Sequence, residues 1–83
     1  MNDREFLIWK NILKQLKEAD GLLVLDTHLQ QDVEMATRDL TTTEFTTELA
    51  AIEARQLITS VRSERGLKYK INDAGRAWLI ESR

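Results

Sequence analysis

The sequence predicts an α+β fold that is mainly helical, with a small antiparallel sheet, in a chain of 83 residues. Apolar residues recur at helical spacing in several segments, whereas residues 67–71 alternate apolar and basic side chains, which is typical of a half-buried strand. The chain has no proline and is 42% apolar, which favours a compact, helix-rich fold over disorder. A chain of this length is expected to form one domain, residues 1–83, with a small core.

A first helix is expected over about residues 3–19, with Asn2 or Asp3 as its N-cap and Gly21 just past its end. The apolar side chains of this helix form a wide arc, and Leu7 lies outside that arc and is expected to be exposed. This face is expected to pack between the third helix and the last helix, or else part of it, or Leu7, contacts a second subunit. The residues of this apolar arc are Phe6, Ile8, Trp9, Ile12, Leu13 and Leu16.

A short apolar run at residues 22–25 predicts a strand that pairs with a later hairpin. A second helix follows, with Asp26 or Thr27 as its cap. Residues 37–41 then form a turn, with Leu40 tucked into the core. The buried stripe of this second helix is expected to contain Leu29, Val33 and Ala36.

A third helix is expected over about residues 42–55. Thr41 and Glu44 fit a capping box, in which the hydroxyl accepts from an amide and the carboxylate reaches back to the cap. The apolar face of this helix, at positions i, i+4 and i+7, consists of Phe45, Leu49 and Ile52.

A two-stranded hairpin and a last helix complete the chain. The strands flank a polar loop, residues 63–66, which ends in a glycine that can adopt positive φ. Asn72 or Asp73 caps the last helix. Its packing face is expected to include Ala74, Ala77 and Trp78.

The tract EARQLITSVRSERGLKYKINDAGRAWL, residues 53–79, resembles the hairpin "wing" and closing helix of small bacterial winged helix-turn-helix regulators. In those proteins the closing helix begins with a T/N-D-x-G-R run, and here Asn72-Asp73-Ala74-Gly75-Arg76 stands in that place. The resemblance extends from about residue 21 to residue 79, and the order helix, strand, helix, helix, strand, strand, helix agrees with it. It implies a winged helix-turn-helix fold and a small DNA-binding transcriptional regulator.

In such a protein the recognition helix, about residues 42–55, lies in the major groove, and the wing, about residues 57–71, lies on the DNA backbone. Threonines at the start of the recognition helix can contact phosphate or pack a methyl group on thymine. The basic residues of the wing, on its tip and outer face, are expected to contact phosphate. The expected DNA-binding residues are Thr42, Thr43, Thr46, Thr47, Arg55, Arg62, Arg65, Lys68 and Lys70.

An alternative is a winged-helix module that binds a protein partner and does not bind DNA. The outer face of the third helix, formed by Thr43, Thr47, Ala50 and Ala54, is small and lacks the Arg, Gln and Asn side chains that read bases. Its flanking acids are Glu44, Glu48 and Glu53, and the sequence pI is near 5.3, which is low for a nucleic-acid binder.

The distribution of charge and the residue composition limit the possible functions further. The middle of the chain, residues 18–53, carries nine acids and one base, whereas residues 54–83 carry seven bases and three acids. The chain has no cysteine and a single histidine, His28, so no metal, cofactor or enzymatic activity is expected. No segment is expected to enter a membrane, and a cytoplasmic protein is expected. The expected partners are duplex DNA and a second copy bound through the first or last helix.

Overall fold

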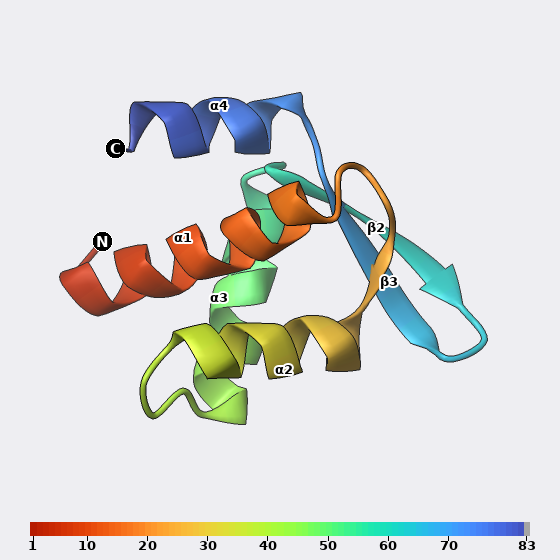
Figure 1. The fold of residues 1–83 in the computed structure, drawn as a ribbon, viewed down its shortest axis with the longest axis horizontal. Coiled ribbons are helices and arrows are strands. Elements are labelled where there is room, and N and C mark those ends of the chain that lie inside the picture. The colour runs from red at the N-terminus through yellow and green to blue at the C-terminus, as the bar shows by residue number, and fades with distance from the viewer. Residues whose placement is uncertain (83) are drawn as a thin grey trace.

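The computed structural model describes residues 1–82 and has an α+β, mainly helical architecture, as the sequence predicts. In Figure 1, α1 crosses the centre between α4 and α2, and the β2–β3 hairpin extends away from the helices. The elements are α1 (Asp3–Glu18), β1 (Val24–Leu25), α2 (Asp26–Ala36), α3 (Thr42–Ala54), β2 (Ile58–Ser63), β3 (Gly66–Ile71) and α4 (Asp73–Glu81).

The three strands form one antiparallel sheet in the order β1-β3-β2. β1 pairs with β3 through Val24 opposite Tyr69, which places the short strand beside the hairpin. β1 is shorter than the predicted strand over residues 22–25. The chain reverses after α1 because Asp20 and Gly21 both adopt positive φ, so only the last part of the apolar run reaches β3.

The core is organised around α1, which packs against α2, α3, α4 and β3. Its predicted apolar arc is confirmed, except that Phe6 is only half-buried, and Leu7 is 43% exposed, as expected. Because one helix contacts all the others, its wide apolar face is explained within a single copy of the chain. The buried residues of α1 are Ile8, Trp9, Ile12, Leu13 and Leu16.

Three helices have the predicted N-caps. The Asn2 side chain accepts from the Glu5 amide at 2.7 Å, and the Asn72 side chain accepts from the Gly75 amide at 2.9 Å. Thr41 heads a complete capping box on α3. The predicted cap on α2 is wrong, because β1 runs directly into the helix and a strand residue without a capping side chain occupies that position.

Three alanines predicted to be buried, Ala36, Ala74 and Ala77, are exposed. In α2 the chain leaves the helix at Ala36, and the next residue, Thr37, is buried instead. In α4 the inner face is rotated toward Gly75, because that residue lies directly against the Leu57 carbonyl oxygen and Ile71.

Gly75→Ala is expected to lower the free energy of unfolding by about 1–3 kcal/mol, the usual cost of overpacking. At an open helical position the same change is favourable by about 1 kcal/mol, so the sign of the effect tests the packing. Here the new Cβ would overlap the Leu57 carbonyl oxygen and lie 2.7 Å from Ile71 Cγ1. Urea denaturation measures the change, with Ala77→Ser on the exposed side of α4 as control. A stabilised Gly75→Ala variant would contradict the close contact.

Candidate nucleic-acid interface

The outward face of α3 is small and uncharged. Thr43, Thr47, Ala50 and Ala54 recur at helical spacing and are all exposed, opposite the buried Phe45–Ile52 side. Threonine offers one hydroxyl and one methyl group, and alanine only a methyl group. The face can therefore approach another surface closely, but it can make few hydrogen bonds.

The other two candidate threonines of α3 already take part in internal hydrogen bonds. Gln30 Nε2, on α2, donates to Thr42 Oγ1 at 3.0 Å. Thr46 Oγ1 donates to the Thr42 carbonyl one turn earlier. The same Gln30 nitrogen also donates to Glu34 at 2.9 Å, so α2 holds the start of α3 through a polar side chain. Thr43 and Thr47 therefore have the hydroxyls best placed for an external partner.

The three glutamates of α3 each accept a hydrogen bond from another element. Glu48 accepts from Trp9 Nε1 of α1 at 2.8 Å, and Glu53 accepts from the Ser60 hydroxyl of β2. Glu44 accepts from the Arg4 guanidinium of α1. The acids flank the outward face, as predicted, but all three are oriented toward neighbouring elements. Of the three, only Glu44 is paired with a cation, Arg4, so Glu48 and Glu53 still carry uncompensated negative charge beside the face.

Arg55 does not join the threonine face. It follows α3, and its guanidinium carbon lies 5.3 Å from the ring centroid of Trp9, in cation–π contact. Arg55 is thus directed toward α1, beside the contact of Trp9 with Trp78. The sequence could not show this contact because Trp9 and Arg55 are far apart along the chain.

The basic residues predicted for the wing lie on two different faces of the hairpin and at its turn. Lys68 lies opposite Val61 and Lys70 opposite Thr59, so these lysines share one face of the sheet. Arg62 lies opposite Leu67 and therefore belongs to the other face, which corrects the expectation of a single basic outer surface. The remaining base, Arg65, is exposed in the turn between the strands.

Asp26, which the sequence suggested only as a helix cap, lies close to the hairpin. A Cβ at Gly66, which has φ +131°, would be 3.4 Å from Asp26 Oδ1 at the start of α2. A side chain at this position would therefore be strained and would also crowd the carboxylate. Because Gly66 has no side chain, the start of β3 can lie close to the start of α2.

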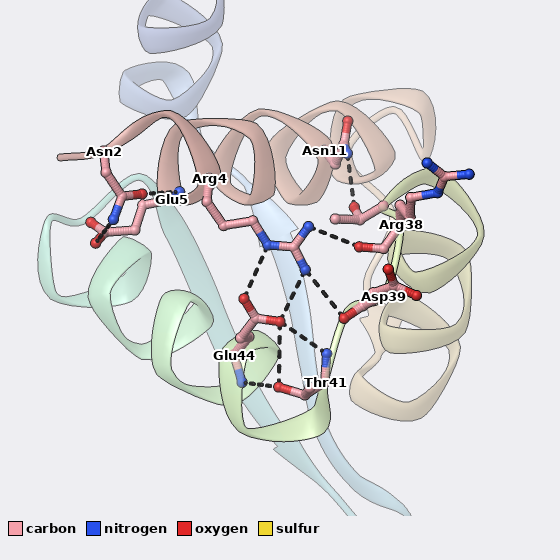
Figure 2. Close-up of polar contacts among 9 residues, drawn as sticks. Asn2, Arg4, Glu5, Asn11, Arg38, Asp39, Thr41 and Glu44 are labelled. Carbon is pink, nitrogen blue, oxygen red and sulfur yellow. Dashed lines mark hydrogen bonds and ion pairs between the residues drawn. The ribbon is translucent and has the colours of Figure 1, made fainter.

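Arg4 is a further residue that sequence reasoning missed, and it ties α1 to the start of α3 (Figure 2). Its Nε and Nη2 donate to the two carboxylate oxygens of Glu44, each at 3.0 Å. Nη1 donates to the Arg38 carbonyl at 2.8 Å, and Nη2 also donates to the Asp39 carbonyl at 3.2 Å. The signal could not be seen in the sequence because the two charged residues are 40 positions apart.

The Arg4 contact changes the acidity of its partner. The hydrogen bond from Arg4, helped by the Thr41 amide, lowers the pKa of Glu44 from 4.5 to about 2. The same interaction raises the pKa of Arg4. Both side chains are about one-third exposed, so water and salt screen the pair. Glu44 therefore stays ionised at any pH near neutrality and serves both as capping residue and as ion-pair partner.

Comparison with protein-family models, with curated proteins and with solved structures gave no match. Within residues 1–82, no helix is both long and apolar enough to cross a membrane, and His, Asp and Glu side chains form no group of three suited to a metal ion.

Acid is expected to remove the stabilisation that ionised Glu44 provides. Because folding lowers the pKa of Glu44, this contribution is complete above pH 4.5 and is lost as the pH falls toward about 2. Urea denaturation of wild type and Glu44→Gln between pH 7 and pH 2 should therefore give stabilities that converge at low pH. Glu64→Gln, in the exposed hairpin turn, is the control for removing one carboxylate. A constant difference between Glu44→Gln and wild type across the range would contradict the assignment.

Proposed function

We propose that this chain is a winged helix-turn-helix protein that binds duplex DNA as a transcriptional regulator, with α3 in the major groove and the β2–β3 hairpin on the phosphate backbone. The observation that carries the proposal is the combination of an outward, uncharged face on α3 with a projecting hairpin that has two lysines on one face. The order of the elements, with α2, a short turn and α3 before the hairpin, supports the same assignment.

The arrangement of α2 and α3 is compatible with α3 acting as a recognition helix. A hydrogen bond from Gln30 to Thr42 links the two helices near the start of α3. Residues at that end of a recognition helix are the ones that approach base edges. Thr43 and Thr47 are exposed there, and their methyl groups can pack on thymine while their hydroxyls contact phosphate or bases.

The hairpin supplies the electrostatic part of the proposed interface. Lys70 is exposed and Lys68 is half-buried on the face that they share, and Arg65 is exposed at the turn. Such contacts hold a protein on the backbone without reading sequence. Because few strong base-reading side chains accompany them, most of the binding free energy would come from phosphate contacts.

A second copy would raise the affinity of such a module. Two linked modules bind DNA more tightly than one because the second contact becomes intramolecular. The first and last helices offer Leu7 and Ile80, which are 43% and 60% exposed, as apolar residues for a homodimer contact. This part of the proposal is checked by sedimentation of the free protein and of its complex with DNA.

Replacing the two hairpin lysines should lower the affinity for DNA and make that affinity less dependent on salt. The double variant Lys68→Glu/Lys70→Glu is expected to lower the slope of log affinity against log salt by roughly 0.9 for each phosphate contact removed. Fluorescence anisotropy with a random-sequence duplex, from low to physiological salt, measures the slope. Lys10→Glu/Lys14→Glu makes the same change of charge on the exposed side of α1. Equal losses in both variants would show a general charge effect and contradict the hairpin interface.

A second candidate function is protein binding through the α3 face. It is favoured by the exposed Ala50 and Ala54, which give a smooth surface suited to close packing against another helix. This role predicts that the wild type shows no amide shifts with DNA even at low salt. It also predicts that Ala50→Arg abolishes binding of a protein partner without changing the fold.

A further inference from the structure

We propose that Arg4 is a positioning residue that orients the first turn of α3, and with it the threonines that face DNA. The inference rests on the proposed function. It assigns a role in DNA recognition to a side chain of α1 that lies outside both the α3 face and the hairpin.

Arg4 uses one rigid, planar group to hold two adjoining parts of the chain. Glu44 belongs to the first turn of α3, and the carbonyls of Arg38 and Asp39 belong to the turn before it. Figure 2 shows the guanidinium between these two sets of acceptors. A guanidinium presents its donors in a fixed fork, so simultaneous bonds to both sets define the angle at which the turn enters the helix.

The α2 end of this turn is held by Asn11 of α1, whose Nδ2 donates to the Ala36 carbonyl and to Thr37 Oγ1, whereas Arg4 holds the end next to α3. Asp39 adopts φ +56°, in the left-handed region that residues with a Cβ rarely occupy. Leu40, two residues before the helix, is only half-buried. The Arg4 contacts to the two carbonyls therefore hold this turn in place from the side of α1.

The first turn of α3 is held less firmly by apolar packing than the rest of the helix. Burial begins at Phe45 and continues at Leu49 and Ile52, all of which lie beyond the start of the helix. Without Arg4, the start of α3 would keep its own capping box, the packing of Leu40 against the core and the hydrogen bond from Gln30 to Thr42. The helix should then remain folded, while the direction of its first turn becomes less well defined.

The hairpin provides an internal reference, because the side-chain hydrogen bonds of Arg4 go to residues 38–44 and not to the hairpin. Loss of Arg4 should therefore affect contacts made by the start of α3 and leave phosphate contacts of the hairpin in place. A general loss of stability would weaken both to a similar extent.

The test is a DNA titration of Arg4→Ala, followed by amide NMR at low salt with a random-sequence duplex. The expected result is loss of the DNA-induced shifts of residues 42–47, with the shifts of residues 62–70 retained. The matched control is Arg76→Ala, because Arg76 also forms an ion pair and has nearly the same side-chain exposure, 39% against 37% for Arg4. Its partner, Asp73, lies in the same helix, so both sets of shifts should persist.

Arg4→Lys is the second variant, because lysine keeps the charge but lacks the fork. It should recover part of the shifts of residues 42–47, and it provides the test if Arg4→Ala fails to fold. Unchanged shifts of residues 42–47 in the folded Arg4 variants would overturn this inference alone. Absence of DNA-induced shifts in the wild type would overturn the proposed function and this inference together.

Discussion

Burial of the apolar arc of α1 is the constraint on which the rest of the structure depends. Ile12, Leu13 and Leu16 are fully buried, and the surfaces that bury them belong to the other helices and the central strand. Truncation of one such side chain usually costs about 2–5 kcal/mol, against a total stability of about 5–15 kcal/mol for a small protein. The other helices and β3 are therefore placed by contact with this helix, and β1 and β2 by their pairing with β3.

Polar groups of the same helix, the Arg4 guanidinium and the Trp9 indole N–H, hold two of the acids beside the candidate interface. Arg4 and Trp9 are both on α1, and they bind Glu44 and Glu48 of α3. An ion pair this exposed adds little to stability, but it fixes directions and neutralises charge. The chain can therefore carry an acidic middle segment and still present an uncharged face on α3. Net charge alone is a poor guide to what this surface can bind.

Local signals in the sequence predicted much of the fold, because caps and apolar periodicity depend on residues within one turn. Thr41 with Glu44, and Asn72 with Gly75, are such cases. The failures depend on contacts between distant segments. Ala77 fits an apolar face by periodicity, yet the approach of Gly75 to the Leu57 carbonyl rotates the helix and leaves the alanine exposed. The candidate site was predicted less well for the same reason, since the contacts of Arg4 and Arg55 join segments about 40 positions apart or more.

The composition of the α3 face limits what kind of DNA recognition the proposal allows. A bidentate contact from Arg, Asn or Gln to a base gives about 1–3 kcal/mol of discrimination, and none of these side chains lies on the Thr43–Ala54 face. Threonine methyl groups and close approach of the backbone distinguish thymine-rich or deformable sites more weakly. Sequence preference would then depend on how accurately α3 is held in the groove, since small side chains have little reach with which to compensate for a displaced helix. Under the proposal, the hydrogen bonds from α1 and α2 to the start of α3 would then matter to recognition as much as the threonines themselves.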